Sequence, residues 1–344
     1  MTSLAVILLA AGKGTRMNSK YQKILHEVGG APMVQHVFNA AQAVADLPPV
    51  LIVGADESGV QDLLGDQAMY AVQAERLGTG HATKMAANIL NGRSSQVIVT
   101  YGDMPLLRAT SLQQLANLQA ETGAAITMLT ALTDDPASYG RIRRATNGDV
   151  LEIVEVATAR QRPNTDELLA INEINVGVYC FDADWLWANI AHLPLRQARS
   201  GHEYYLTDLV ETAVKQNKRV AAVITDDPTE GLGAGTRAEM VAVERAFRQR
   251  AINHWLANGV TILDPLSTYI DQTVTLGQDC VIWPNTYLQG HTQIGDNCVI
   301  GPNTTLRDTT VDEDCCLENV VIELSHITAG QVIPPFSHIQ GETN

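Results

Sequence analysis

Short apolar runs alternate with amphipathic segments from the start of the chain to about residue 230. This alternation is typical of an α/β domain with a mostly parallel sheet. The segments 32–45 and 80–90 predict helices. The expected strands are 4–9, 50–53, 96–100, 124–131, 150–154, 174–181 and 220–224. Because ligands of such sheets bind beyond the carboxyl ends of the strands, we expect a functional site at that edge.

The periodicity changes after residue 236. Residues 237–258 predict one long helix that ends near Gly259. Beyond it, a larger unit repeats: DCVIWPNTYL at 279–288 aligns with NCVIGPNTTL at 297–306, an offset of 18 residues. Aliphatic residues recur every six positions, at Ile270, Leu276, Ile282, Leu288, Ile294, Ile300 and Leu306. Hexads of this kind predict a short left-handed parallel β-helix in which each hexad forms one face of a triangular coil.

Two details of the repeat carry further expectations. The hexad register slips at Asp312 and resumes at Ile327, which predicts a loop or an irregular coil between them. Cys280, Cys298 and Cys316 are spaced 18 residues apart. A thiol ladder for metal or redox chemistry is one interpretation, and the favoured one is that cysteine fills a small inward position in successive coils.

The fold class that follows is α/β: a Rossmann-like domain with a mostly parallel sheet, followed by a short left-handed parallel β-helix. We expect domain boundaries at 1–236, 237–259 for a bridging helix, and 260–344. The chain has 344 residues, 45% of them apolar, and a formal net charge of −15. Such an acidic chain is not expected to bind nucleic acid or an anionic membrane. Five cysteines without a secretory context favour reduced thiols and a cytoplasmic location.

A glycine-rich turn follows the first expected strand. Residues 9–23 read LAAGKGTRMNSKYQK. Gly12 and Gly14 allow backbone N–H groups to approach an anion, and the cations of this segment would offset the charge of a polyphosphate. The turn matches neither common phosphate loop, because Gly14 follows Lys13 where a Walker A motif needs Ser or Thr, and Met17 replaces the third glycine of a dinucleotide motif.

Several motifs in a fixed order extend this picture: LAAGKGTRM at 9–17, LGTGHA at 77–82, YGD at 101–103, YGRI at 139–142 and EYYLTD at 203–208. With them and with Lys23, Gln73, Glu155 and Asn175, the chain resembles the sugar nucleotidyltransferases. The resemblance is to the bacterial N-acetylglucosamine-1-phosphate uridyltransferase family and covers nearly all of residues 4–305. It implies transfer of UMP from UTP to N-acetylglucosamine 1-phosphate, with release of pyrophosphate.

The resemblance also implies roles for single residues. Arg16, Lys23 and Asp103 would be catalytic, with Asp103 binding Mg²⁺. The uracil, ribose and phosphate would contact Leu9, Ala10, Ala11, Gly12, Gly14, Gln73, Gly78, Thr79, Tyr101 and Gly102. The sugar would contact Gly140, Glu155, Asn175, Tyr205 and Thr207. His81 is expected to pack at a helix start and to have no catalytic role.

The chain departs from the family pattern at four places. Gly235 or Thr236 stands where a metal-binding Asn is usual, Ala157 replaces a Lys, and Gln22 replaces a Pro. The sequence ends at Asn344, before the residues of an acetyltransferase site, so we expect no acetyltransferase activity. The β-helix is expected to form a homotrimer. Two alternatives stay open: another sugar 1-phosphate or nucleotide, or a UDP-sugar-binding regulatory protein without turnover.

Overall fold

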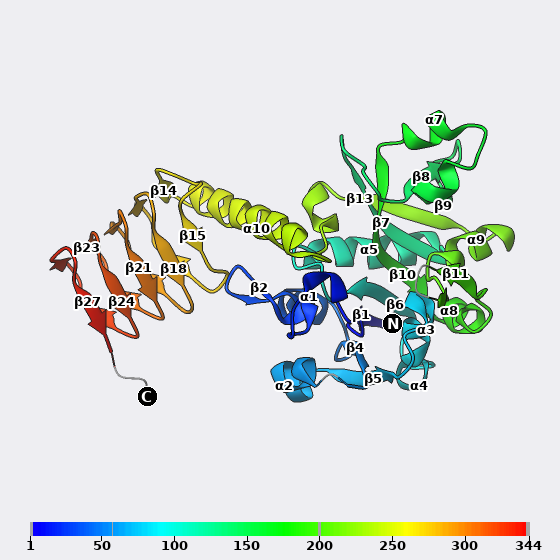
Figure 1. The fold of residues 1–344 in the computed structure, drawn as a ribbon, viewed down its shortest axis with the longest axis horizontal. Coiled ribbons are helices and arrows are strands. Elements are labelled where there is room, and N and C mark those ends of the chain that lie inside the picture. Colours follow the sequence, from blue (N-terminus) through cyan, green and yellow to red (C-terminus); the bar gives the residue numbers. More distant parts are fainter. Residues whose placement is uncertain (1–2, 57, 199–200, 342–344) are drawn as a thin grey trace. The chain divides into compact units, whose positions relative to one another are not determined.

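A computed structural model describes residues 3–56, 58–198 and 201–341 of the protein (Figure 1). Contacts divide the chain into two compact units. The first unit contains the residues up to His26 together with Pro32–Met240, and the second contains Glu27–Ala31 together with the residues from Val241 onward. In the part of the chain that is described, no helix combines the length and the apolar character needed to cross a membrane.

The first unit is built on a nine-stranded sheet in the order β13-β7-β10-β6-β1-β4-β5, in which β8 also pairs with β10 and β9 pairs with β8. Its strands are β1 Leu4–Leu9, β4 Val50–Gly54, β5 Met69–Gln73, β6 Gln96–Tyr101, β7 Ile126–Leu132, β8 Arg141–Arg144, β9 Val150–Val154, β10 Glu173–Asp182 and β13 Val220–Ile224. Strands β1, β4, β5 and β6 are parallel, as are β7 and β13, whereas β10 runs antiparallel to β6 and β7. The sheet is therefore mostly parallel, as expected.

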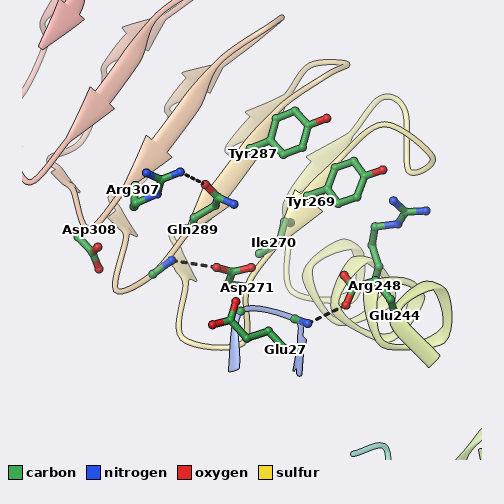
Figure 2. A pocket seen from close by; sticks show the side chains of 13 residues that line it. Glu27, Glu244, Arg248, Tyr269, Ile270, Asp271, Tyr287, Gln289, Arg307 and Asp308 are labelled. Atoms are coloured by element: carbon green, nitrogen blue, oxygen red, sulfur yellow. Dashed lines mark hydrogen bonds between the residues drawn. The ribbon is translucent and has the colours of Figure 1, made fainter. Parts of the chain in front are cut away.

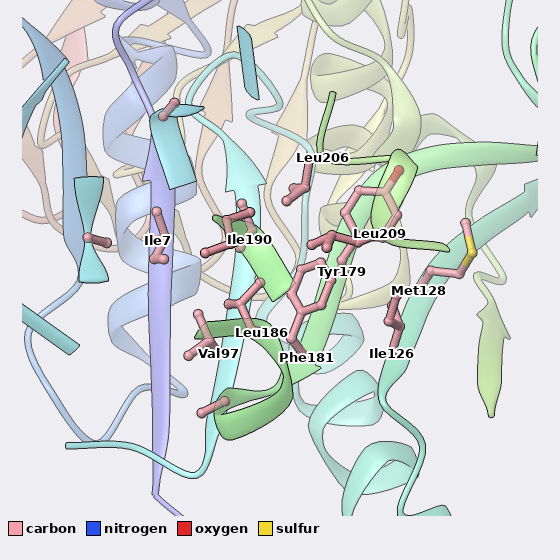
Figure 3. Close-up of a cluster of buried hydrophobic side chains, with 14 of the residues drawn as sticks. Ile7, Val97, Ile126, Met128, Tyr179, Phe181, Leu186, Ile190, Leu206 and Leu209 are labelled. Atoms are coloured by element: carbon pink, nitrogen blue, oxygen red, sulfur yellow. The ribbon is translucent and has the colours of Figure 1, made fainter. Parts of the chain in front are cut away.

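Helices cover both faces of this sheet. They are α1 Met33–Gln42, α2 Gly59–Leu64, α3 Gly78–Met85, α4 Ala87–Leu90, α5 Ala109–Thr122, α6 Val156–Ala159, α7 Thr165–Leu169, α8 Ala183–Ile190 and α9 Asp208–Lys215. In β1, Ile7 packs with residues of α3, α8 and α9 on one face, and Leu8 packs with residues of α1 and α5 on the other. Figure 3 shows the first of these cores, with Tyr179 and Phe181 of β10 at its centre. Strands buried on both faces explain why their sequences are continuous apolar runs.

Short elements complete the first part of the chain. They are η1 Thr15–Met17, η2 Lys23–Leu25, β2 Glu27–Val28, β3 Ala31–Pro32, η3 Gly65–Gln67, β11 Arg196–Ala198, β12 Gly201–Glu203 and η4 Pro228–Gly231. Every strand expected from the sequence is present, within two residues at either end. Two strands of the nine-stranded sheet were missed, β5 and β8. β5 is an edge strand in which Val72 is half exposed. β8 is not an apolar run, because it carries three arginines.

The second unit contains most of α10 Arg237–Ala257 and a parallel β-helix. One sheet has β14 Thr261–Ile262, β17 Val281–Ile282, β20 Val299–Ile300, β23 Cys316–Leu317 and β26 Val332–Ile333. The next has β15 Tyr269–Ile270, β18 Tyr287–Gln289, β21 Thr305–Arg307, β24 Val321–Glu323 and β27 His338–Gln340. The third has β16 Thr275–Leu276, β19 Gln293–Ile294, β22 Thr310–Val311 and β25 His326–Ile327. The hexad aliphatic residues form its core, which confirms the predicted repeat.

Of the two alternatives expected after Asp312, the irregular coil is confirmed and the loop is wrong. The coil continues through this region, with Val311, Leu317 and Ile322 buried in the core between Leu306 and Ile327. Their positions show that some turns hold five residues in place of six, so the repeat shortens while the sheet pairing persists. Counting strictly in sixes therefore misplaces the inward residues after Leu306, although the stacked strands tolerate the shorter turn.

Because of the shorter turn, Cys315 and not Cys316 occupies the inward position that was expected for the third cysteine. Cys280, Cys298 and Cys315 are buried at the inward positions, whereas Cys316 is half-buried at the next position. Their thiols donate to backbone carbonyls of the neighbouring coil: Cys280 to Gly295 at 3.0 Å and Cys298 to Asp312 at 3.2 Å. Among the described residues, no three His, Cys, Asp or Glu side chains are grouped so as to bind a metal ion. The packing interpretation is therefore the one that the structure favours.

Candidate active site

A cavity of about 280 Å³ lies at the carboxyl ends of β1, β5 and β6 in the first unit. Ten of the residues singled out in the sequence line it: Leu9, Ala10, Ala11, Gly12, Lys23, Gln73, Gly78, Thr79, Tyr101 and Asp103. The backbone of this wall is held in place by hydrogen bonds to the sheet, from Ala10 N to Ile52 O at 2.9 Å and from Gly102 N to Leu9 O at 3.0 Å. The turn after the first strand is therefore part of a cavity wall.

Lys23 and Asp103 meet at this wall. The ammonium of Lys23 forms an ion pair with Oδ2 of Asp103, and only 16% and 18% of the two side chains are exposed. Gly14 makes this arrangement possible, because it adopts φ 59° and a Cβ at this position would overlap the Lys23 side chain. The glycine turn thus allows a cation and a carboxylate to lie side by side within the cavity.

Another part of the wall comes from the start of α3 and from Glu203. Gln73 donates from Nε2 to the Gly78 carbonyl at 3.1 Å and contacts Nδ1 of His81 at the same distance. Thr79 accepts a hydrogen bond at Oγ1 from the Leu206 backbone N–H at 3.0 Å. These bonds fix the amide of Gln73 at the cavity. His81 lies within α3, and the cavity lining does not include it.

A second group of predicted residues lies around Glu155. A Cβ on Gly140 would approach Oε1 of Glu155 to 3.1 Å, so glycine leaves room for this carboxylate. Loss of hydration raises the pKa of Glu155 above its ordinary value. Asn175 donates from its backbone N–H to Gly140 O at 2.9 Å, and its side chain forms hydrogen bonds with the Tyr179 hydroxyl.

Tyr101 connects the two groups. Burial raises the pKa of its hydroxyl to about 12, and the negative charges of Asp103 and Glu155 add to this shift. Tyr101 therefore lies within electrostatic range of a carboxylate from each group. Tyr205 also has a raised pKa, first from partial burial and then from nearby carboxylates that include Glu155. Thr207 precedes α9 as its N-cap residue.

Arg16 is the exception among the expected catalytic residues. It lies in η1, it is exposed, and it is not part of the cavity lining. Its guanidinium lies beside Gly235, where an added Cβ would be 2.5 Å from Nη2. The cavity lining does not include Gly14 or Gly102, and Lys13 and Lys20 are exposed and also absent from it.

Two charged residues of the cavity lining were given no role in the sequence analysis, Arg76 and Glu203. Arg76 donates from Nε to the Ala11 carbonyl at 2.6 Å and so adds a cation to the cavity wall next to the glycine turn. Glu203 lines the cavity beside Gly78. Arg76 was not predicted because it lies outside the recognised motifs. Glu203 belongs to the motif at 203–208, but only Tyr205 and Thr207 of that motif were assigned to the site.

A buried carboxylate anchors the segment that leads toward Arg16. Glu230 in η4 is 0% exposed and accepts hydrogen bonds from Arg108, from Ser111 Oγ at 2.8 Å and from Thr225 Oγ1 at 2.6 Å. Three residues after the end of η4, the Ala234 N–H donates to the backbone carbonyl of Asp103 at 3.2 Å. The segment after η4 is therefore held by Glu230 before its start and by Ala234 beside Asp103, which lines the cavity.

A larger cavity, of about 500 Å³, lies in the second unit. Figure 2 shows its wall of strands with the parallel rings of Tyr269 and Tyr287, whose centroids are 4.7 Å apart. Its charged side chains are Glu27, Glu244, Asp271, Asp308, Arg248 and Arg307. Burial and then the neighbouring Glu244 and Glu27 raise the pKa of Asp271. Because carboxylates outnumber guanidinium groups here, this cavity disfavours a polyphosphate ligand.

Comparison with known protein families agrees with both units. Residues 6–168 match the MobA-like NTP transferase domain, and residues 273–308 match the bacterial transferase hexapeptide, in six repeats. The fold and the site therefore define a nucleotidyltransferase that carries a hexapeptide-repeat β-helix.

Two curated relatives refine this class. The bifunctional protein GlmU of Exiguobacterium sibiricum is 41% identical over 337 residues, which are 97% of this chain and 73% of the relative. The bifunctional protein GlmU of Pelotomaculum thermopropionicum is 42% identical over 340 residues, which are 99% of this chain and 73% of the relative. The chain belongs to the GlmU family and is a sugar-phosphate nucleotidyltransferase.

Proposed function

We propose that the chain transfers UMP from UTP to N-acetylglucosamine 1-phosphate and releases pyrophosphate. The observation that carries the proposal is the Lys23–Asp103 pair in the wall of a cavity formed by the glycine turn. A cation offsets phosphate charge, and a carboxylate binds a hard metal ion. Membership of the GlmU family supports the choice of this reaction.

The residues of the chain divide into three tasks. Gln73, Thr79 and the backbone of residues 9–12 would bind the uracil and ribose, because an amide can both donate to and accept from a pyrimidine edge. Lys23 and Arg16 would bind phosphate oxygens and stabilise the charge that moves onto pyrophosphate. Glu155 and Asn175 would bind hydroxyl and amide groups of the sugar. The attacking phosphate is already an anion, so no general base is needed.

Asp103 would be the protein ligand of Mg²⁺. Its carboxylate reaches the cavity, and Mg²⁺ commonly binds one or two carboxylates together with phosphate oxygens. The described residues thus suit an ion that is held jointly by protein and nucleotide. When bound, Mg²⁺ would neutralise charge on the phosphates and help to align them.

Pyrophosphate release tests this function. The protein would be incubated with UTP, N-acetylglucosamine 1-phosphate and Mg²⁺, and pyrophosphate would be measured by a coupled assay. We expect release that needs all three additions. No release together with tight binding of UDP-N-acetylglucosamine would identify a binding protein without turnover. Faster release with another sugar 1-phosphate or another nucleotide would replace the proposed substrates.

Assembly and location are proposed on separate grounds. We propose a homotrimer through the β-helix, because the outward residues Tyr287 and Val321 of one of its sheets are 39% and 38% exposed. Light scattering tests this, and a monomer would contradict it. We propose that the protein works in the cytoplasm, where free thiols such as those of its five cysteines stay reduced. The absence of acetyltransferase activity remains a prediction.

A further inference from the structure

The side-chain amide of Gln73 is held by two contacts in the cavity wall. Its Nε2 lies 3.1 Å from the carbonyl oxygen of Gly78 and 3.1 Å from Nδ1 of His81. A carbonyl oxygen can only accept a hydrogen bond, so the amide atom that faces Gly78 is the NH₂ nitrogen. Gln73 lines the cavity and is only 4% exposed. Its contacts therefore fix the orientation of the amide within a nearly closed environment.

The second contact determines which nitrogen of His81 carries the proton. Because the NH₂ group of an amide can only donate, Nδ1 of His81 is the acceptor, and the ring proton is on Nε2. His81 is half-buried in α3, and its ring lies 6.5 Å from that of Tyr204, measured between centroids. The imidazole is thus held in place beside the amide.

The first contact is equally well fixed. Gly78 has φ 91°, and a Cβ at this position would lie 2.7 Å from the backbone oxygen of Tyr204. The same oxygen accepts from the Gly80 N–H at 2.8 Å. Both acceptors of the Gln73 amide therefore belong to the start of one helix, which is packed closely against residue 204.

These contacts use both hydrogens of Gln73 Nε2. An amide in general can donate and accept, but here only Oε1 remains for a ligand. Among the residues that the structure describes, none donates a hydrogen bond to this oxygen. Uracil has a hydrogen on N3 and can donate to such an oxygen. Cytosine has a lone pair at N3, which would face the lone pairs of Oε1 and leave this oxygen without a donor.

We propose that His81 is a positioning residue for base selection: by accepting from Gln73, it leaves Oε1 as the only amide atom that the base can contact. The site then favours a pyrimidine with a hydrogen on N3 over one with a lone pair there, because an unpaired buried acceptor costs binding free energy. This inference rests on the proposed function and deepens it. The sequence suggested only a packing role for His81, and the hydrogen bond to Gln73 adds a second one.

His81→Phe tests this role, because it keeps an aromatic ring but removes the acceptor. Calorimetry would measure the affinities for UTP and for CTP, each with Mg²⁺ and without sugar phosphate. The wild-type protein should bind UTP about 100-fold more tightly than CTP. In His81→Phe one hydrogen of Gln73 Nε2 becomes available to N3 of cytosine, so the ratio of the two affinities should fall about tenfold.

Two variants serve as controls. His81→Asn places a side-chain oxygen at about the same distance from the backbone as Nδ1 of histidine, so it can accept from Gln73 and should keep the wild-type ratio. His192→Phe makes the same exchange as the test variant at an exposed position after α8. It should leave both affinities unchanged.

The ratio separates positioning from packing. Equal losses of UTP and CTP affinity in His81→Phe would contradict the inference, because a packing role alone affects both nucleotides. A ratio that falls as far in His81→Asn as in His81→Phe would also contradict it. If His81→Phe does not fold, Gln73→Leu gives the test, since it removes the amide that His81 holds and should lower the ratio at least as much. An unchanged ratio in Gln73→Leu would contradict the inference.

The wild-type protein distinguishes this inference from the proposed function. Pyrophosphate release from UTP together with an unchanged ratio in the variants would contradict only the role of His81. A wild-type protein that neither binds UTP nor releases pyrophosphate would contradict the proposed function as well.

Discussion

The ammonium of Lys23 and the carboxylate of Asp103 form an ion pair although 80 residues separate them in the chain. Lys23 follows the glycine turn in η2, and Asp103 follows β6, which is paired with β1. The parallel pairing of β1 and β6 brings the residues after both strands to one edge of the sheet. In the proposed reaction, Asp103 would exchange the lysine for Mg²⁺, which leaves Lys23 to bind phosphate.

Asp103→Asn should lower turnover by about 10²- to 10³-fold, because the amide keeps the shape of the side chain but loses the charge that holds the metal. The rate of pyrophosphate release at saturating UTP and increasing Mg²⁺ measures this. Asp134→Asn, at an exposed position, serves as the matched control. A rate for Asp103→Asn equal to that of the control would remove Asp103 from the reaction.

Arg16→Ala should lower turnover to a similar degree, about 10²- to 10³-fold, because a partner of the developing phosphate charge is lost. The exposed position of Arg16 predicts an unchanged melting temperature. Steady-state kinetics and thermal unfolding on the same preparations check both expectations. An unchanged rate would exclude Arg16 from the mechanism.

Arg108→Met should destabilise the first unit by about 3 kcal/mol, because it leaves the fully buried Glu230 carboxylate without its cation. Urea unfolding measures the loss. Arg143→Met is the comparison, since Arg143 pairs with the partly exposed Glu152 at the surface and should cost at most about 1 kcal/mol. Equal effects of the two substitutions would show that the Glu230 network does not anchor η4.

Acidification should destabilise the protein through His26. Burial, and then the charge of Arg237, lowers the pKa of His26 from its ordinary 6.5. The folded state therefore binds this proton less readily than the unfolded state, and stability falls as the pH drops below 6.5 toward the lowered pKa. His26→Asn should lose less stability than wild type between pH 7 and pH 5. Parallel pH profiles of the two melting temperatures would contradict this.

Thiol labelling should distinguish the adjacent cysteines of the β-helix. Cys315 is buried and donates to the Thr328 carbonyl at 3.3 Å, whereas Cys316 is half-buried. Under native conditions, a thiol reagent should modify Cys316 first, and Cys316→Ser should abolish this first phase. If only Cys315→Ser abolished the first phase, Cys315 would be the accessible thiol, and the register of this coil would differ from the structure by one residue.

The sequence predicts the order of the elements and the repeat of the β-helix better than it predicts which side chains contact one another. Periodicity identified the α/β order and the hexads because burial imposes those patterns on neighbouring residues. The five-residue turns after Leu306 were not predicted. A strict six-residue count assumes equal turns, whereas the stacked strands of the β-helix tolerate a turn that is one residue shorter. Lys23 and Asp103 were expected in one site, but their ion pair was not predicted. Contacts between residues that follow different strands depend on the strand order, which the sequence pattern does not give.

The position of Arg16 beside Gly235 was not predictable from spacing. Gly235 was noted as a missing metal ligand, and the structure shows that its lack of a side chain makes room for a guanidinium. The Thr236-x-x-Glu239 pattern was available in the sequence as a helix-capping signal. Its proximity to Arg16, however, depends on how η1 and the start of α10 pack together within the first unit.

A crystal structure with UDP-N-acetylglucosamine and Mg²⁺ tests the central claim most directly. We predict the uracil beside Gln73 and the metal ion on Asp103, both within the cavity of the first unit, and the sugar beside Glu155. Nucleotide density confined to another surface, or a metal ion away from Asp103 with nucleotide bound, would contradict the account.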